Sequence, residues 1–201
     1  MRKMVLTLAG LALVASPAFA GKYNKTVSVG EKAPAFAGIP AVQGTQDSSL
    51  TLGDIKEDVV VLVFLANHCP VVINYDDRII DFTNDYKGKS VKVVGVAVSS
   101  MKQDQLPGIK EHVAEKKIPY VYGYDESQAI GKAYGATNTP QFFVLDKDRK
   151  IAYMGAMDDS PNNEAKVTKQ YLRNAVDAVL KGEKPEVEET RPVGCGISYS
   201  K

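Results

Sequence analysis

One seven-residue run constrains the fold more than any other part of the chain. Residues 59–65 read Val-Val-Val-Leu-Val-Phe-Leu, a continuous apolar stretch of strand length. Such a run is typical of a strand that is buried on both faces, because a half-exposed strand alternates apolar and polar residues. Burial on both faces requires covering elements on each side of a sheet. The run therefore predicts a layered α/β fold.

A helix is expected directly after this strand. Pro70 suits the first helical turn, where its missing N–H costs nothing. Apolar residues seven positions apart give residues 70–86 a broad apolar side. Farther along, residues 91–98 predict a second buried strand, residues 106–117 a charged surface helix, and residues 120–122 a short strand.

The second half of the chain continues this alternation. Residues 141–145 and 150–154 predict two strands joined by a polar turn, and residues 166–181 predict the last helix. Asp125 and Gln128 have the spacing of a capping box, in which the two side chains close a helix N-terminus.

The order of elements predicts the fold class and the place of the chemistry. Strands and helices alternate, which indicates an α/β fold with a central mixed sheet and helices on both faces. Residues 37–57 read mostly as turns. Open sheets of this kind place their chemistry beyond the C-terminal ends of strands, and Cys69 lies at such an end.

The first twenty residues read as a targeting segment. Arg2 and Lys3 precede an apolar run, and Ala18-Phe19-Ala20 has the small-x-small pattern of a cleavage site. The apolar run is shorter than the roughly 20 residues that a spanning helix needs. We therefore expect an exported protein, periplasmic or secreted, with no membrane span after cleavage; an uncleaved anchor is the alternative. The expected parts are a signal peptide (1–20), one domain (21–182) and an extended tail (183–201) that carries Cys195.

The net charge of the chain argues against a nucleic-acid partner. Without Arg2 and Lys3, the chain keeps 23 of its 25 basic residues and all 24 acidic residues, a net charge of −1. This balance provides no basic field for nucleic acid and no acidic block that would suggest an interaction tail. We expect no nucleic-acid partner.

The chain has two cysteines, Cys69 and Cys195. Cys69 lies where the buried strand gives way to a helix, and the unpaired N–H groups and the dipole of a helix N-terminus favour an anion. They therefore favour the thiolate, which is the reactive form of cysteine. Cys195, on a mobile segment, would be the second, resolving thiol. In an oxidising compartment, a permanent structural disulfide between the two is the alternative.

Thr139 and Pro140 directly precede the apolar strand at 141–145. An X-Pro bond is the only common site for a cis peptide, so Thr139-Pro140 is a candidate. Pro140 would shape a substrate groove, because the residue before such a proline can offer its backbone groups to an extended peptide. The alternative is that both residues only shape the turn before the strand.

These pieces together resemble a known family. A proline facing a helix-terminal cysteine is similar to the thioredoxin-fold active site, and with an Ala-Pro-x-Phe segment at residues 33–36 the match covers most of residues 28–180. Within that superfamily the chain resembles the redoxin (alkyl hydroperoxide reductase/thiol-specific antioxidant) group, which is peroxiredoxin-like. It is most similar to proteins with Cys-Asn-His-Cys-Pro at the helix start and Gly-Cys near the C-terminus. The resemblance implies a thioredoxin-like fold and thiol redox chemistry that needs no organic cofactor.

The departures from that pattern bear on the reaction. Ala66 stands where this group usually has a cysteine, and Val72 stands where the Cys-x-x-Cys partner of Cys69 would fall. A self-contained dithiol is therefore excluded. Peroxiredoxins usually have a threonine at the position of Ala66 and an arginine in the region of Pro140. These absences favour thiol–disulfide exchange, whereas a lone cysteine with a distant partner favours peroxide reduction.

We expect Cys69 to attack either a peroxide or a disulfide, with Cys195 or an external thiol reductant completing the cycle. One alternative is a redox-inactive module whose proline groove binds a partner. Another is metal delivery through His68, Cys69 and Cys195, although a zinc site needs three or four ligands. His68 could instead favour the thiolate of Cys69 when protonated, or simply cap the helix.

Charged residues on two of the predicted helices are expected to face solvent. Asp76, Asp77 and Arg78 read as a solvated helix face, and His112 lies in a charged helix. Asp158 and its neighbour Asp159 precede Ser-Pro and read as part of a loop, where a metal role is not expected.

Overall fold

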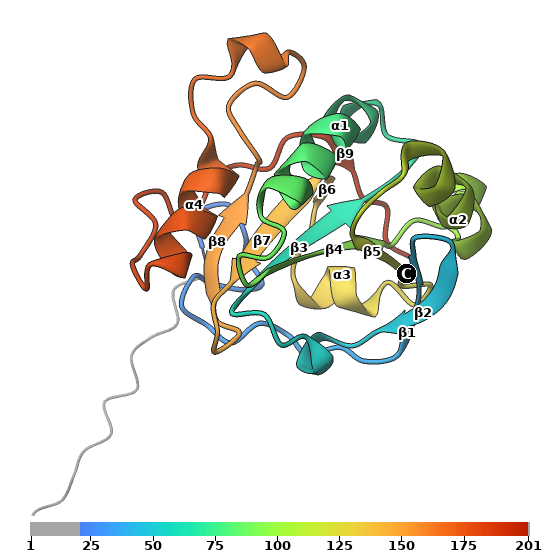
Figure 1. Ribbon diagram of the computed structural model, residues 1–201, viewed down its shortest axis with the longest axis horizontal. Coiled ribbons are helices and arrows are strands. Elements are labelled where there is room, and N and C mark those ends of the chain that lie inside the picture. Colours follow the sequence, from blue (N-terminus) through green and yellow to red (C-terminus); the bar gives the residue numbers. More distant parts are fainter. Residues whose placement is uncertain (1–20, 201) are drawn as a thin grey trace, which may run out of the picture.

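A computed structural model of the protein describes residues 21–200 (Figure 1). The expected signal peptide at residues 1–20 lies outside the described residues. The fold is built on a seven-stranded mixed sheet with the order β2-β1-β5-β4-β3-β7-β8, which confirms the predicted fold class. Its strands are β1 (Ile39–Gln43), β2 (Gln46–Leu50), β3 (Val59–Leu65), β4 (Val91–Ala97), β5 (Val121–Tyr124), β7 (Gln141–Leu145) and β8 (Ile151–Gly155).

The strand β3 is the centre of the sheet. It pairs in parallel with β4 along its whole length and antiparallel with β7 on its other side. All seven of its residues are buried. Val61 and Val63 pack into one hydrophobic cluster and Leu62 and Phe64 into another, on opposite faces of the sheet. The run is continuous in sequence because both faces of the strand meet a core.

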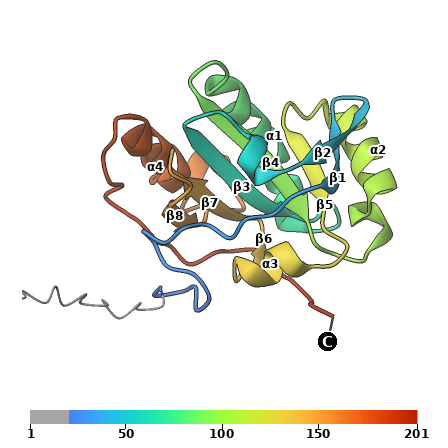
Figure 2. The same cartoon turned by 90° about the horizontal axis from the view of Figure 1, so that it is seen from below.

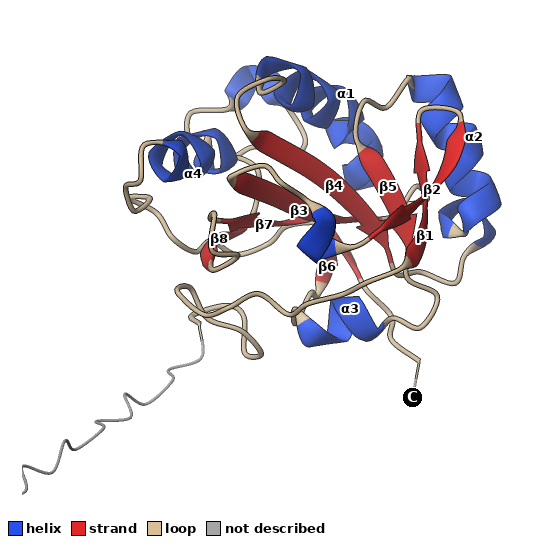
Figure 3. Ribbon diagram, turned by 60° about the horizontal axis from the view of Figure 1, so that its bottom comes forward, coloured by secondary structure: helices blue, strands red, loops and turns tan. Residues whose placement is uncertain are grey.

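Helices cover both faces of the sheet (Figures 2 and 3). Helices α1 (Pro70–Asp85), α2 (Leu106–Lys116) and α4 (Tyr171–Leu180) lie on one side, and the short α3 (Ala129–Ala133) lies on the other. The apolar residues of α1, α2 and α4 pack into the first cluster, and Ile130 of α3 packs into the second. Among the described residues, none of these helices combines the length and the apolarity needed to traverse a bilayer.

Two sequence predictions about elements are wrong. Residues 37–57 contain the hairpin of β1 and β2, which joins the sheet through antiparallel pairing of β1 with β5. The sequence pattern of this hairpin is weak because β2 is a polar edge strand in which only Leu50 is fully buried. The last helix begins at Tyr171, because Glu164–Lys166 forms a separate 3-10 turn.

The segment after α4 is extended and returns across the molecule to the start of α1 (Figure 1). The Thr190 N–H donates to the Met154 carbonyl, and the Met154 N–H donates to the Glu188 carbonyl, so this segment runs along the edge of β8. It then forms a short strand, β9 (Cys195–Gly196), which pairs antiparallel with β6 (Asn138–Thr139). The two-stranded sheet therefore brings the C-terminal region to the segment before β7.

Candidate active site

Cys69 lies at the N-cap of α1, one turn beyond the end of β3. Pro70 occupies the first helical turn, and the Cys69 carbonyl accepts a hydrogen bond from the Ile73 N–H at 3.0 Å. The predicted position at a helix N-terminus is confirmed. The side chain has no surface exposed to solvent, 0% of its reference area. A thiolate at this sulfur would be held at the positive end of a 16-residue helix.

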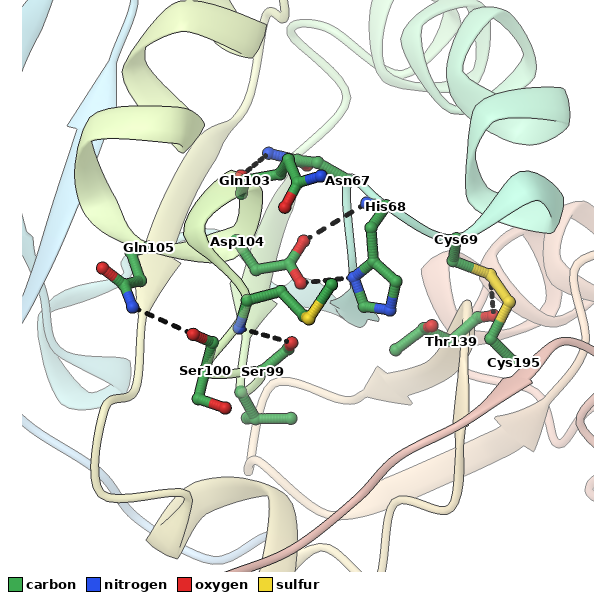
Figure 4. A network of polar contacts seen from close by, with 12 residues as sticks. Asn67, His68, Cys69, Ser99, Ser100, Gln103, Asp104, Gln105, Thr139 and Cys195 are labelled. Carbon is green, nitrogen blue, oxygen red and sulfur yellow. Dashed lines mark hydrogen bonds and ion pairs between the residues drawn. A yellow bond between two sulfur atoms is a disulfide. The ribbon is translucent and has the colours of Figure 1, made fainter.

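The structure joins Cys69 to Cys195 in a disulfide (Figure 4). The two residues are 126 positions apart in sequence, and their Cα atoms are 6.0 Å apart. This Cα separation is typical of disulfides. Cys195 is partly buried, whereas Cys69 is fully buried.

The segment that the sequence singled out before β7 lies against this disulfide. The Thr139-Pro140 peptide bond is cis, as predicted. The Thr139 carbonyl oxygen is 3.2 Å from the Cys69 sulfur, and Thr139 is the register partner of Cys195 in the β6–β9 pair. Thr139, Pro140 and both cysteines therefore belong to one site, although the sequence places them in three separate segments.

The tail lies against β6 closely enough to require a glycine. A Cβ added at Gly194 would overlap the Thr139 carbonyl oxygen and lie 2.7 Å from its carbonyl carbon. The Asn138 side-chain amide donates to the Gly194 carbonyl at 3.0 Å, and the Ile197 N–H donates to the Thr137 carbonyl at 2.9 Å. These contacts place Cys195 beside Thr139 independently of the disulfide itself.

Beyond Cys195, the tail is held by Gln128 and Tyr199. The Gln128 amide donates to the Ser198 carbonyl at 3.0 Å and accepts from the Ser200 N–H at 2.6 Å. The Tyr199 hydroxyl donates to the Ala136 carbonyl at 2.8 Å. The predicted mobile segment is thus a docked one between residues 194 and 200.

This use of Gln128 corrects the capping-box prediction. Gln128 is the N-cap of α3 but makes no capping hydrogen bond with its side chain, and its amide donates to the Val98 carbonyl at 2.7 Å instead. Asp125 provides part of the cap, because its carboxylate accepts from the Ile130 N–H at 2.7 Å. The sequence spacing identified a helix start but not the tail that Gln128 binds.

His68, directly before Cys69, is held by a buried carboxylate. Its ring Nδ1 is 2.5 Å from an oxygen of Asp104, which is 0% exposed, whereas the His68 side chain is 34% exposed. The His68 N–H also donates to Asp104, at 3.4 Å. An ionised carboxylate can only accept, so Nδ1 donates its proton to it and Nε2 is the nitrogen left to exchange protons. Figure 4 shows this pair beside the disulfide.

Asp104 is a site residue that sequence reasoning missed. It ends the 3-10 turn Lys102–Asp104, in a polar segment without any pattern that distinguishes it from surface. The loop before Cys69 is fixed in the same region, because the Asn67 amide donates to the Gln103 carbonyl at 2.7 Å and the Tyr122 hydroxyl donates to Asn67 at 2.9 Å.

The predicted solvated face of α1 is wrong at two of its three residues. Asp77 is exposed, but Asp76 and Arg78 are buried. Arg78 donates to the Asp158 carboxylate at 2.8 Å and also to two loop carbonyls, those of Ser160 and Pro161. Asp158 lies in a loop, as predicted, and is buried there as the partner of Arg78. Arg78 and Asp158 tolerate burial because they are paired with each other.

His112 is also less exposed than its helix suggested. Its side chain is 14% exposed, and its Nε2 lies 3.2 Å from the buried Asp76 carboxylate. In residues 21–200, no group of three or more histidine, cysteine, aspartate or glutamate side chains has an arrangement suited to a metal ion. The sulfur of Cys69, which the metal-delivery alternative would use with His68, is bonded to Cys195.

Comparison with known proteins places this site in a family context. Residues 28–172 match the family model of Redoxin. An uncharacterized conserved protein from Geobacillus kaustophilus is 34% identical, with a TM-score of 0.78 over 86% of this chain and 93% of its own. A hypothetical protein from Sinorhizobium meliloti is 30% identical, with a TM-score of 0.78 over 88% of this chain and 97% of its own.

A more distant match extends the fold comparison. The thioredoxin domain of a thiol-disulfide oxidoreductase from Bacteroides vulgatus is 21% identical, with a TM-score of 0.52 over 62% of this chain and 86% of its own. At this identity the similarity shows the thioredoxin-like fold alone. A search of curated protein sequences gives no significant match.

Proposed function

Since the chain belongs to the Redoxin family, we propose that it is a thiol–disulfide oxidoreductase whose redox pair is Cys69 and Cys195. One observation carries the proposal: the two sulfurs are bonded at the N-terminus of α1, against the carbonyl that precedes the cis proline. Here Cys195, from the tail, supplies the second sulfur that the sequence lacks at position 66.

The position of Cys69 favours a reversible bond over a permanent one. Breaking the disulfide leaves a thiolate on Cys69, and the dipole and free N–H groups of α1 stabilise that anion. A low thiol pKa on the leaving side speeds thiol–disulfide exchange. Thr139 and Pro140 are proposed to position the sulfurs, and His68 to move protons to and from them.

Peroxide reduction is the second candidate, supported by the distant resolving cysteine. A peroxide oxygen must reach the Cys69 sulfur, which is 0% exposed while the tail is docked. Exchange requires only that a thiol reach the partly exposed Cys195. This difference in access favours exchange, with a disulfide as substrate and an external thiol as reductant.

We also propose that the protein works outside the cytoplasm. The basic, apolar and small-x-small segments of residues 1–20 have the pattern of a signal peptide. An exported domain would meet an oxidising compartment, in which the Cys69–Cys195 bond can persist. On this proposal the mature protein begins at Gly21, with a domain to residue 182 and a functional tail to residue 201.

The test is a redox titration of the folded protein in glutathione buffers, with free thiols alkylated and counted by intact mass. The proposal expects two thiols to appear together and reversibly while the fold is retained. It expects Cys69→Ser and Cys195→Ser each to abolish catalytic turnover of a small disulfide with an external thiol. A bond that opens only on unfolding would instead identify a structural staple.

The same variants separate the remaining alternatives. A redox-inactive binding module would hold its partner equally well with and without Cys69→Ser. A metal-delivery protein would retain copper or zinc stoichiometrically in the reduced wild type and lose it in Cys69→Ser. If the wild type turns over hydrogen peroxide and Cys69 forms a sulfenic acid during the reaction, the result would favour peroxide reduction, the second candidate.

A further inference from the structure

The two cysteines of the disulfide differ in their exposure to solvent, and the tail that carries Cys195 fills a sheet edge. We infer that Cys195 is the sulfur at which external thiols exchange, and that the docked tail selects low-molecular-weight thiols and disulfides over extended peptides. The inference rests on the proposed function and deepens it. It assigns Cys69 the role of internal leaving group rather than that of the first attacking thiol.

Access is the first argument. The Cys69 side chain is 0% exposed, and its sulfur lies inside, 3.2 Å from the Thr139 carbonyl oxygen. Cys195 is partly exposed. An incoming thiolate must reach a sulfur along the S–S axis from the side opposite the bond that breaks. Of the two cysteines, only Cys195 has surface exposed to solvent.

The leaving group is the second argument. Attack on Cys195 expels Cys69, whose thiolate forms at the N-terminus of a 16-residue helix. Attack on Cys69 would expel Cys195, which belongs to a two-residue strand rather than to α1, so its sulfur is one bond farther from the helix N-terminus. Exchange is faster when the expelled thiol has the lower pKa. Access and leaving-group stability therefore point to the same sulfur.

The step balances as an ordinary two-electron exchange. A thiolate RS⁻ bonds to the Cys195 sulfur as the S–S bond breaks, which gives a Cys195–SR mixed disulfide and a Cys69 thiolate. A second RS⁻ then attacks the R sulfur and releases RSSR and the Cys195 thiolate. The protein disulfide gains two electrons, the two external thiols lose them, and the protein thiolates take protons from water. The reverse sequence reduces RSSR.

The occupied sheet edge is the third argument. A peptide that binds as an added strand needs free backbone groups on β6. Here Thr139 and Asn138 are already paired with Cys195 and Gly196, and the Thr137 carbonyl accepts from Ile197. The tail thus occupies the position that an extended substrate would need.

The tail is held at points that do not depend on the disulfide. Gln128 binds the backbone of Ser198 and Ser200, and the Tyr199 hydroxyl binds the Ala136 carbonyl. A Cβ on Gly131 would lie 2.6 Å from the Tyr199 oxygen, so this side chain packs directly on α3. Reduction removes none of these contacts. The edge therefore stays filled in the dithiol form. A small thiol or disulfide, unlike an extended peptide, needs no free backbone groups on β6 in order to react at Cys195.

The first experiment maps the attacked sulfur. Oxidised wild-type protein is mixed with glutathione, quenched in acid and digested, and the adduct is located by mass. The inference expects glutathione on Cys195 and a free Cys69; an adduct on Cys69 overturns it. In parallel, Cys69→Ser and Cys195→Ser are labelled with 5,5′-dithiobis(2-nitrobenzoate). The remaining Cys195 should react at least about tenfold faster than the remaining Cys69, and equal or inverted rates overturn the inference even where no adduct accumulates.

The second experiment tests substrate size. Reduced protein is reacted with oxidised glutathione and with an extended peptide whose cysteine carries a glutathione mixed disulfide. The wild type should react with the peptide on the order of tenfold more slowly, and Tyr199→Ala, which loosens the tail away from the sulfurs, should narrow that gap. A peptide that reacts faster with the wild type, or a gap that Tyr199→Ala leaves unchanged, overturns the inference. If neither disulfide reacts, the proposed function itself fails.

Discussion

The Asp104 carboxylate contacts His68 at two atoms, the ring Nδ1 and the backbone N–H. Asp104 is fully buried, whereas the His68 side chain is about one-third exposed. The buried carboxylate therefore holds the orientation of an imidazole ring that solvent can reach. Because His68 directly precedes Cys69, this fixed ring lies beside the sulfur that is expelled during exchange. Histidine is the side chain suited to proton transfer near neutral pH.

The first prediction concerns Asp104 as a positioning residue. Asp104→Asn replaces an obligate acceptor by an amide that can donate to Nδ1, which permits the other ring tautomer. We expect the exchange rate with glutathione to fall by at least about tenfold. The loss should be much smaller in the His68→Gln background, where no imidazole remains to be positioned. Stopped-flow reduction of the disulfide in the wild type, the two single variants and the double variant measures both effects.

Asp77→Asn is the matched control, because Asp77 is an exposed carboxylate in the first half of α1. It removes a carboxylate charge from α1 without changing the contact to His68, so the exchange rate should stay close to that of the wild type. An equal loss of rate from Asp104→Asn with and without His68 would contradict a positioning role, even if that variant were less stable.

The second prediction concerns stability. The disulfide links residues 126 positions apart, so it restricts the unfolded chain strongly. In the chain-entropy description a loop of this size contributes about 4–5 kcal/mol to the free energy of unfolding. Urea unfolding of the wild type with and without reductant measures the difference. Cys69→Ser/Cys195→Ser should show no dependence on reductant; a wild-type loss below about 1 kcal/mol would mean that the unfolded chain is barely restricted.

Local patterns predicted the parts of the site that depend on neighbouring residues. The β3 run, the start of α1 at Pro70 and the cis bond before Pro140 each follow from a few adjacent residues. The pairing of Thr139 with Cys195 does not, because it depends on where a tail 56 positions away docks. The sequence suggested a Cys69–Cys195 disulfide as one alternative, but it could not show whether the tail reaches Cys69.

Buried charge was the least predictable feature for the same reason. Arg78 follows two acidic residues in a helix, a pattern typical of a solvent-exposed face. Its partner Asp158 is 80 positions away in sequence. Asp104 and His68 are 36 positions apart. A charged residue enters a core only with its partner, and a single sequence does not show which partner the fold supplies. Gln128 was placed correctly at a helix start, yet its side chain binds the tail.

The third prediction uses the close approach of the tail to β6. A methyl group at Gly194 would overlap the Thr139 carbonyl, so Gly194→Ala must displace the tail from its register. Overpacking of this kind typically costs about 1–3 kcal/mol. Because the displacement opposes bond formation, we expect the reduction potential of the pair to rise by about 30 mV or more, since 30 mV corresponds to about 1.4 kcal/mol.

Gly196→Ala is the matched control for this measurement. It lies two residues away in the same tail, and a Cβ there would have no atom within 4 Å. Equilibration with glutathione buffers should give this variant the wild-type potential. Equal shifts in both variants would attribute the effect to the tail backbone in general rather than to the contact with Thr139.

The fourth prediction concerns the pH dependence of tail docking. Burial, with the nearby Asp125 carboxylate, raises the pKa of Tyr199 from 10.0 to about 12. A released tail exposes this phenol, whose pKa returns to about 10. Between pH 10 and 12, the Tyr199 hydroxyl loses its proton in the released tail but keeps it in the docked tail. Deprotonation therefore favours the released form. The tail should therefore be docked most stably below pH 10, and its docking should weaken progressively as the pH rises through 12.

The chain has no tryptophan, so Ser200→Trp provides a single fluorescent reporter on the tail. In the background Cys69→Ser/Cys195→Ser, which removes the cross-link and the thiols, its anisotropy should fall between pH 10 and 12 as the tail is released. Adding Tyr199→Phe keeps the ring but removes the ionisable hydroxyl, so the fall should disappear from this interval. Identical alkaline transitions with tyrosine and with phenylalanine would show that another group controls the release of the tail.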